Sequence, residues 1–404
     1  MNNMEFVIKR IGDICSSSCS GGTPKSSEPS YYEGGTIPWL TTGEVNFKDI
    51  YETENKITEL GLQKSAAKYI PINSVIVAMY GVTAGKSAIN KIELTTNQAC
   101  CNLQIDEKQA NYRFVYYYLM LQSDQLNKLA NGGAQQNLNS IIIKKFKIPL
   151  PDLSVQNKIA NVLSNYDRII ENNNKRIRLL ESIAESIYKE WFIRYRFPGC
   201  ENYVFTDGYP VKWKKCKLRE VAHESGKPLK KEFAKAFKYY LPIDCIPNRA
   251  MMLQGYDNIE NAESSLESFS TGNILFGAMR TYFHKVVIAP FDGVTRSTCF
   301  IIDANNKKYQ NYLYLFLYQD STIDYSSTVS VGSTMPYVRW KDLNRIGLVM
   351  PDEVTIEKFN KIVDPILKQI RQMFFVNENL KKQRDALLPR LMSGDLSVEG
   401  KEIV

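Results

Sequence analysis

Two short stretches of the 404-residue chain carry residue types that do chemistry in other proteins. The stretch GVTAGKS (Gly81 to Ser87) is similar to a phosphate-binding P-loop, but three residues separate its glycines where that motif requires four. The residues that follow, AINKIELTTNQACCNLQI, are typical of strand and turn, whereas a P-loop needs a helix N-terminus to hold the phosphate. We therefore interpret this stretch as a hairpin loop that exposes Lys86.

The second stretch places carboxylates beside a lysine, as metal-dependent nucleases do. Asp352, Glu357 and Lys358 have suitable side chains, but the matching first-half stretch PDLSVQNK has no second carboxylate. Both stretches stand at expected helix starts, where Asp is an ordinary capping residue. The chain also contains no Gly-x-Gly-x-x-Gly after a strand, no His-Glu-x-x-His and no Gly-x-Ser-x-Gly. The sequence thus predicts a protein without catalytic residues, bound metal or cofactor of its own.

Polar, aromatic and basic residues instead gather near glycines and expected turns in both halves of the chain. In the major groove of DNA, Arg reads guanine and Asn or Gln reads adenine, while Lys, Ser and Thr hold phosphates. Our candidate DNA-binding residues are Tyr31, Tyr32, Thr41, Thr42, Lys86, Asn97, Gln98, Gln135, Gln136 and Asn137 in the first half, and Arg280, Tyr282, His284, Lys285, Arg296, Ser333, Thr334, Tyr337 and Arg339 in the second. Because any surface loop is polar, these assignments rest on residue type and loop position alone.

Composition limits the class of protein that must hold these loops. At about 150 residues per domain, the length predicts two or three domains, and 44% apolar with 23% charged residues is enough for packed cores. The net charge of +8 permits a polyanionic partner. Eight Cys without a Cys-x-x-Cys pair, and only two His, disfavour a disulfide scaffold and structural zinc. Without an apolar leader or a long apolar run, the chain is expected in the cytoplasm, away from membranes.

A long internal repeat divides the chain into two similar halves. Gly132 to Pro151 aligns with Gly332 to Pro351 at an offset of 200 residues, which places Phe146 over Ile346. Four further matches occur in the same order: RIGDI (10–14) with KLREV (217–221), Gly22-Thr23-Pro24 with Gly226-Lys227-Pro228, Ala78-Met79 with Ala278-Met279, and Cys100 with Cys299. The agreement in order indicates a duplicated architecture.

Each half contains β-rich material followed by one long helix. Short alternating runs such as SVIVAMY and KVVIAP, separated by Gly, Asn and Pro, predict mixed β-rich domains. After Pro151-Asp152 and Pro351-Asp352, apolar residues recur at alternating steps of four and three. We expect Ser154 to cap the first helix and Gly394 to end the second. The expected seams are Ile159, Leu163, Tyr166, Ile170, Asn173, Ile177, Leu180, Ala184, Ile187 and Trp191, then Phe359, Ile362, Ile366, Gln369, Met373, Val376, Leu380, Gln383 and Leu387.

These seams predict an α+β fold in which two mixed α/β domains are joined by an antiparallel intramolecular coiled coil with a pseudo-twofold repeat. A helix of residues 155–192 would be roughly 55 Å long, more than a globular domain covers. Asn173 and Gln369 would then fix the register of the pair. Alternatively, each helix packs only on its own domain. Pro365 either kinks the second helix or, after Asp364, begins a new one.

The chain resembles the specificity (S) subunits of Type I restriction-modification systems in four segments and in the order of domains and helices. The segments are TIPWLTTGEV (36–45), SVIVAMYGVTAGKSAI (74–89), GGAQQNLNSIIIKKFKIPLPDLSVQNKIANVL (132–163) and LKKQRDALLPRLMSGDL (380–396). The resemblance implies a first target recognition domain in residues 1–150 and a second in residues 199–350. It also implies helical spacers in residues 151–198 and 351–404.

In such a protein, each recognition domain reads one half of a bipartite, asymmetric DNA target. The resemblance further implies that the helices set the spacer and dock two methyltransferase (M) subunits, and that the complex recruits restriction (R) subunits. S-adenosylmethionine, ATP and magnesium are expected only in those partners. The competing hypotheses are a self-contained nuclease or methyltransferase and a coiled-coil scaffold whose domains bind proteins. Salt-dependent, sequence-selective binding of double-stranded DNA would distinguish the reader from the scaffold.

Overall fold

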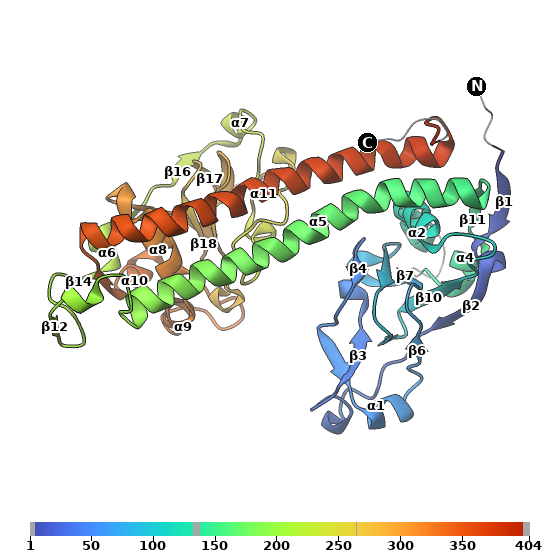
Figure 1. Cartoon of the computed structure of the whole chain (residues 1–404), viewed down its shortest axis with the longest axis horizontal. Helices are drawn as coiled ribbons and strands as arrows, with labels where there is room; N and C mark the ends of the chain where they lie inside the picture. The colour runs from blue at the N-terminus through green and yellow to red at the C-terminus, as the bar shows by residue number, and fades with distance from the viewer. Residues whose placement is uncertain (1–4, 132–137, 264, 399–404) are drawn as a thin grey trace. The chain divides into compact units, whose positions relative to one another are not determined.

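The computed structural model describes residues 5–131, 138–263 and 265–398 (Figure 1). The chain forms two compact units: the first joins the residues up to Arg168 with those from Lys381 onward, and the second comprises Ile169–Leu380. Two long helices, α5 (Leu153–Tyr188) and α11 (Glu353–Ser393), each contribute residues to both units. The mixture of sheets, short helices and two long helices confirms the expected α+β class.

Three sheets form the β-rich part of the first unit. The largest has the strand order β2-β10-β7-β8-β4, the second has the order β5-β3-β9-β6, and β1 pairs with β11. Strand β7 lies inside its sheet and all four of its residues are buried, which explains its unbroken apolar run VIVA. The strands are β1 (Val7–Arg10), β2 (Cys15–Ser20), β3 (Ile37–Leu40), β4 (Asp49–Ile50), β5 (Asn55–Ile57), β6 (Tyr69–Ile70), β7 (Val75–Ala78), β8 (Ser87–Asn90), β9 (Leu94–Thr96), β10 (Cys100–Ile105) and β11 (Lys147–Leu150).

Helix α2 packs on strands β7 and β8 of the largest sheet of the first unit. Asn111 caps helix α2: its Oδ1 accepts hydrogen bonds from the backbone N–H groups of Arg113 (2.8 Å) and Phe114 (3.1 Å). Its apolar face, including Phe114 and Tyr117, shares one core with Leu163 of α5. The short helices are α1 (Glu59–Gln63), α2 (Tyr112–Leu121), α3 (Ser123–Asn131) and α4 (Ser140–Lys145).

The second unit repeats this plan with smaller sheets. Their strand orders are β15-β21-β18-β19, β16-β17-β20, β14-β22 and β12-β13. The strands are β12 (Phe205–Thr206), β13 (Tyr209–Pro210), β14 (Lys214–Lys217), β15 (Ala222–Glu224), β16 (Lys227–Leu229), β17 (Leu266–Phe269), β18 (Ile274–Gly277), β19 (Val286–Ile288), β20 (Gly293–Arg296), β21 (Cys299–Ala304) and β22 (Gly347–Met350). The short helices are α6 (Leu218–Val221), α7 (Lys231–Ala234), α8 (Gln310–Leu317), α9 (Asp320–Thr328) and α10 (Trp340–Leu343).

Equivalent hydrogen bonds confirm the repeat at the domain ends. The Ile11 N–H donates to the Phe146 carbonyl (2.9 Å), and the Leu218 N–H donates to the Ile346 carbonyl (3.0 Å). The predicted alignment, in which Phe146 and Ile346 occupy equivalent positions of the two repeats, is therefore correct.

In the middle of the repeat, the predicted alignment is wrong by one residue. Cys100 pairs with Ala78, and Cys299 pairs with Gly277, so Ala78 corresponds to Gly277 and not to Ala278. The sequence alignment favoured the shared Ala-Met dipeptide, whereas the ladder register requires an offset of 199.

The long helices contact each other within each unit, which rejects the alternative that each covers only its own domain. In the second unit, the rings of Trp191 and Phe359 lie 5.7 Å apart, and Asn173 of α5 is hydrogen-bonded to Asn377 of α11. Residue numbers rise along one helix as they fall along the other, so the pair is antiparallel. In the first unit, Leu163 of α5 and Leu391 of α11 share a core, and Arg384 of α11 pairs with Asp167 of α5.

The seam predicted for α5 is correct throughout. Its ten predicted positions, Ile159 to Trp191, are buried or half-buried, and Asn173 lies among them. A π-helical turn, η5 (Lys189–Ile193), continues α5 and carries Trp191 into the core of the second unit.

The seam predicted for α11 is wrong at three of its nine positions. Ile362, Val376 and Gln383 are exposed and Gln369 is only half-buried, while their next neighbours Val363, Ile370, Asn377 and Arg384 are buried. The sequence pattern followed the apolar residues Ile362 and Val376, whereas the true seam admits a buried Asn and a buried Arg. Asn173 is hydrogen-bonded to Asn377, so the polar residue of α11 that meets Asn173 is Asn377 and not Gln369.

The helix ends also differ in part from expectation. Helix α5 begins at Leu153 with the Asp152 carbonyl accepting from Val155 N–H (2.9 Å), so Ser154 is not the cap. Helix α11 continues through Pro365. This proline has no N–H to donate to the carbonyl four residues earlier, but the site is exposed, so water can donate to that carbonyl instead. Gly394, with φ of 83°, follows the last helical residue as predicted.

Candidate nucleic-acid interface

The P-loop-like stretch is a hairpin loop, as predicted. The 3-10 turn η4 (Gly81–Thr83) joins β7 to β8, and a strand, not a helix, follows Lys86. Lys86 is half-buried: its Nζ donates to Asn46 Oδ1 (2.9 Å) and lies 5.8 Å from the Phe47 ring centre. This lysine is thus more strongly held than the exposed one we expected.

Thr41 and Thr42 stand beside this hairpin. Thr83 Oγ1 donates to the Thr42 carbonyl (2.7 Å), which ties the hairpin to η3 (Thr42–Glu44). Buried Glu44 caps the turn by accepting from the Thr41 N–H (3.2 Å). The structure therefore brings Thr41, Thr42 and Lys86 into one region of the first unit.

Among the remaining described candidates of the first unit, Tyr32 contacts Trp39. Tyr32 OH donates to the Pro24 carbonyl (2.5 Å), and its ring meets Trp39 edge-on at 5.9 Å. Asn97 Oδ1 accepts from the Ala99 N–H (3.2 Å), while Gln98 is exposed and bonded to Thr23. Tyr31 is half-buried, and Gln135, Gln136 and Asn137 lie outside the described residues. Most of these side chains thus already have a partner, and their contact with DNA stays a prediction.

In the second unit, two loops bring most of the candidates together. The Arg280 N–H donates to the Pro336 carbonyl (2.7 Å), and Met279 forms a β-bridge with Tyr337. Tyr282, Ser333, Thr334 and Tyr337 are exposed around this junction. The two loops, residues 279–283 and 331–338, form the surface that we call the paired-loop surface.

His284 lies under this surface and has structural partners. Its Nε2 lies 2.9 Å from the Tyr318 carbonyl, and its Nδ1 lies 3.5 Å from Asp320 Oδ1. Burial lowers the pKa of His284 below its usual value, an effect that the Tyr318 hydrogen bond opposes. Arg249 also pairs with Asp320 (Nη2 to Oδ2, 3.0 Å), so the base of the hairpin is held by several polar contacts.

The other three candidates of the second unit lie elsewhere. Lys285 Nζ donates to the Ile243 carbonyl (2.9 Å), and Arg339 Nε donates to Asp342 Oδ2 (2.6 Å) at the start of α10. Arg296 lies on β20, and its Nε is buried without a hydrogen-bond partner in the described part of the chain. Among the described residues, none of these three side chains forms a hydrogen bond to either loop of the paired-loop surface, and their role also stays a prediction.

A lysine-rich segment, residues 227–238, is missing from our predicted list. It begins on β16 and contains five exposed lysines, none of which forms an ion pair with a described residue. These are Lys227, Lys230, Lys231, Lys235 and Lys238. Phe233 is exposed among them. The charge run GKPLKKEFAKAFK could have revealed this segment, because such runs mark nucleic-acid contacts.

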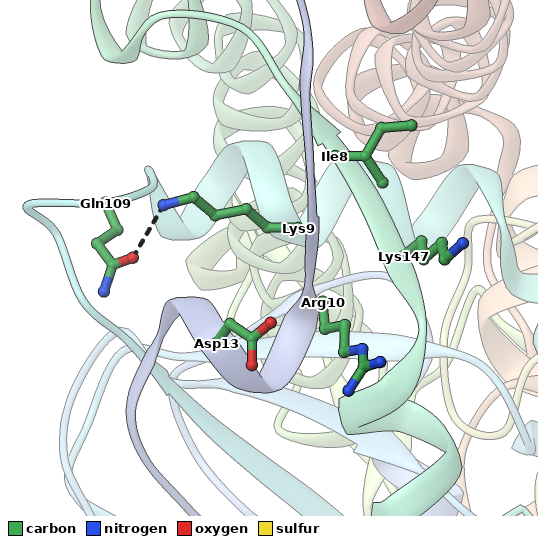
Figure 2. Close-up of a pocket in the computed structure, with 6 residues that line it drawn as sticks. All are labelled: Ile8, Lys9, Arg10, Asp13, Gln109 and Lys147. Carbon is green, nitrogen blue, oxygen red and sulfur yellow. Dashed lines mark hydrogen bonds between the residues drawn. The ribbon is translucent and has the colours of Figure 1, made fainter.

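A shallow depression of about 540 Å³ lies beside the β1–β11 pair of the first unit. Lys9, Arg10 and Lys147 line it together with Asp13, and Lys9 Nζ donates to Gln109 (3.1 Å). Figure 2 shows that the cationic side chains diverge from one another instead of meeting at one point. The depression can attract an anion but has no arrangement that would orient a substrate.

The residues considered for nuclease chemistry serve separate structural roles. Asp352 accepts hydrogen bonds from the Thr355 N–H (2.9 Å) and Trp213 Nε1 (3.1 Å). Glu357 pairs with Lys308, and Lys358 donates to the Pro198 carbonyl (3.3 Å). Over the described residues, no group of three or more His, Cys, Asp or Glu side chains is placed to share a metal ion.

The buried thiols are packing residues and not nucleophiles. Burial raises the pKa of both Cys100 and Cys299 to about 12, so each stays protonated at neutral pH. They occupy equivalent ladder positions in the two units.

The long helices carry exposed apolar residues. In the second unit, these include Leu179 and Ile183 on α5 and Ile362, Phe375 and Val376 on α11. We call them the outer apolar residues. Within the described part of the chain, no helix is long and apolar enough to cross a membrane.

The chain matches the family model described as Type I restriction modification DNA specificity domain twice, over residues 3–182 and 210–381. The Type I restriction enzyme MjaIX specificity subunit of Methanocaldococcus jannaschii is 30% identical over 421 residues, which cover 98% of this chain and 94% of that protein. The EcoR124I/EcoR124II specificity subunit of Escherichia coli is 26% identical over 195 residues, 47% of this chain and 45% of that protein.

A solved structure has the same fold. The crystal structure of the S subunit of a Type-I restriction-modification system from M. genitalium aligns with a TM-score of 0.57 at 17% identity, covering 97% of each chain. At this identity, the likeness concerns the fold alone.

Proposed function

Because the chain belongs to the family of Type I restriction modification DNA specificity domains, we propose that it is the sequence-specific DNA-binding subunit of such a system and catalyses no reaction itself. Each β-rich domain reads one half of a bipartite DNA target. The single observation that carries this proposal is the duplicated architecture, whose ladders match while its loop residues differ. Two readers with different loops recognise two different half-sites, so the target is asymmetric.

We assign residues 1–150 and 199–350 to the two readers, and residues 151–198 and 351–404 to the helical spacers. This division differs from the two compact units, because each unit also includes part of both helices. The antiparallel helix pair sets the distance between the half-sites. A continuous α11, with Pro365 inside it, supports this role because an unbroken helix holds a fixed length.

The methyltransferase subunits dock on the helix pair. The outer apolar residues support this assignment, because they are exposed in this chain and would be covered in a complex. S-adenosylmethionine, ATP and magnesium belong to the methyltransferase and restriction subunits, and the complex acts on DNA in the cytoplasm.

The test is an exchange of residues 1–150 for those of another specificity subunit, followed by mapping of methylated adenines in a host without other methyltransferases. The expected result is a new first half-site with the second half-site and the spacer unchanged. A change of both half-sites would contradict independent readers. Methyl transfer or hydrolysis by the purified chain alone would favour an enzyme. Absence of sequence-selective DNA retention, with and without methyltransferase subunits, would favour a protein-binding scaffold.

A further inference from the structure

The two units contain equivalent hairpins that differ where they meet solvent. The hairpin β7–β8 is closed by a bond from the Ala78 N–H to the Lys86 carbonyl (2.9 Å), and β18–β19 by one from the Gly277 N–H to the Lys285 carbonyl (2.8 Å). The closing pairs therefore correspond, and the residues between them can be compared position by position.

Two positions in each hairpin adopt left-handed backbone conformations. In the first unit they are glycines, Gly81 and Gly85, with φ of 78° and 84°. In the second unit they are Arg280 and His284, with φ of 47° and 55°. Glycine adopts this conformation freely, whereas a side chain there costs energy. His284 is held by its contacts with Tyr318 and Asp320, but Arg280 has no such internal partner.

The backbone of Arg280 is fixed by the neighbouring loop. Its N–H donates to the Pro336 carbonyl (2.7 Å), and the Val338 N–H donates to the Ala278 carbonyl (2.9 Å). The strained residue therefore sits in a short antiparallel contact between two loops, which holds its Cα–Cβ direction.

The guanidinium of Arg280 is unpaired in the described part of the chain. It forms no ion pair or hydrogen bond there, and its Nε is buried without a partner. The remaining donors are Nη1 and Nη2, which form a planar fork. A planar fork of two donors suits a ligand that accepts two hydrogen bonds side by side.

Apolar and aromatic side chains are exposed on the two loops of the paired-loop surface that hold Arg280. Tyr282 is 56% exposed and Met335 is 54% exposed, and Phe283 and Tyr337 are also exposed. No carboxylate of the described residues neutralises the arginine. An unneutralised Arg among exposed aromatic and apolar residues fits the edge of a base pair, which offers both acceptors and an apolar methyl group.

We propose that Arg280 reads a guanine of the second half-site, with Nη1 and Nη2 donating to its O6 and N7 in the major groove. This inference rests on the proposed function of the chain as a DNA reader. The strained backbone holds the guanidinium ready for that contact, and the first unit, with Gly81 at the equivalent position, does not make it.

The test compares wild type with R280A and R280G, each assembled with the methyltransferase subunits. Duplexes carry 7-deazaguanine, which lacks the N7 acceptor, at one guanine of the second half-site at a time. At one position, replacement of guanine by 7-deazaguanine is expected to lower the affinity of wild type about 10-fold to 100-fold. R280A and R280G are expected to show no loss there, and their methylated sites should tolerate any base at that position.

R280G separates folding from recognition. Glycine adopts the left-handed backbone conformation without strain, so the melting temperature of R280G should be no lower than that of wild type. The variant should nevertheless lose the preference for guanine in the second half-site. R345A is the matched control, because Arg345 is an exposed arginine of the same unit, on the turn between α10 and β22. Its methylated sites should equal those of wild type.

The outcomes separate this inference from the proposed function. If wild type binds no specific site, the proposed function is wrong. If wild type binds a specific site but R280A and R280G keep the same target, or if the second half-site contains no guanine, Arg280 is not the reader. A uniform loss of affinity on all sequences, with an unchanged target, would assign Arg280 to a phosphate and also overturn the inference.

Discussion

Asn173 of α5 donates a hydrogen bond from Nδ2 to Oδ1 of Asn377 on α11, at 2.8 Å. Asn377 Nδ2 in turn donates to Asn174 Oδ1 (3.0 Å), so Asn377 both accepts and donates. Asn377 is buried in a seam that is otherwise mostly apolar. A buried polar pair is stable only when its members face each other, so this pair specifies the register of the two helices.

We expect unequal effects from single and double replacement of this pair. N377L leaves the Asn173 amide without its partner and should lower the free energy of unfolding by about 1–3 kcal/mol. The double variant N173L/N377L removes both polar groups of the Asn173–Asn377 bond and leaves only the half-buried Asn174, which water can reach, so it should unfold no more easily than wild type. Denaturant unfolding of wild type, N173L, N377L and the double variant measures these free energies. The control is N172L, at an exposed neighbouring position. An N377L protein as stable as wild type would mean that the pair does not hold the register.

The contacts of the helix pair also determine where a longer spacer can be built. Asn173 faces Asn377 and Trp191 faces Phe359, so Leu180 lies opposite Ile370 and not opposite Leu380. Adding one heptad after Leu180 and another after Ile370 should lengthen the pair by roughly 10 Å and the unread spacer by about three base pairs. Mapping of methylated adenines measures the spacer, and both half-sites should remain unchanged.

An insertion in one helix alone is the control for that experiment. It moves Asn173 away from Asn377 and should lower the melting temperature. If the two-helix insertion leaves the spacer unchanged, the helices are not the ruler.

The lysine-rich segment should contribute to affinity without changing specificity. Lys230 and Lys231 are exposed and have no ion-pair partner among the described residues. If both contact phosphates, K230Q/K231Q should reduce the slope of log K against log salt by about 1.8, because each phosphate contact contributes about 0.9. Binding titrations over a range of salt concentrations measure the slope. The double variant K158Q/K361Q, on exposed faces of α5 and α11, should keep the wild-type slope.

His284 should make the second unit sensitive to acid. Burial lowers its pKa in the folded state, so the unfolded chain binds a proton first as the pH falls. Its stabilising contribution is complete above the unfolded value of about 6.5 and is lost as the pH falls through the lower folded value. The carboxylates of Asp320 and Glu185 oppose the shift, and the positive charge of Arg249 adds to it.

The variant H284N tests this prediction, since Asn tolerates the left-handed backbone and does not titrate. Below pH 6.5, the free energy of unfolding of wild type should fall more steeply than that of H284N. Parallel curves between pH 8 and pH 5 would show that His284 does not control this sensitivity. Asp320, whose pKa its Arg249 hydrogen bond lowers, acts only at more acidic pH.

The sequence determined the duplication, the α+β class, the long helices and the complete α5 seam. These features follow from periodicity, which is local: burial of one face repeats every three or four residues in a helix and every two in a strand. Gly394 ends α11 for an equally local reason, because a left-handed residue after the helix favours glycine.

Only the tertiary structure decided the α11 seam, the offset of the ladders and the surroundings of Arg280. Asn377 and Arg384 look like surface residues in the sequence, but each is buried against a partner on α5, Asn173 and Asp167. Likewise, Ala78 corresponds to Gly277 because of their hydrogen-bonded partners on the next strand. Polar groups can be buried only where a distant residue satisfies them, and no local pattern identifies that residue.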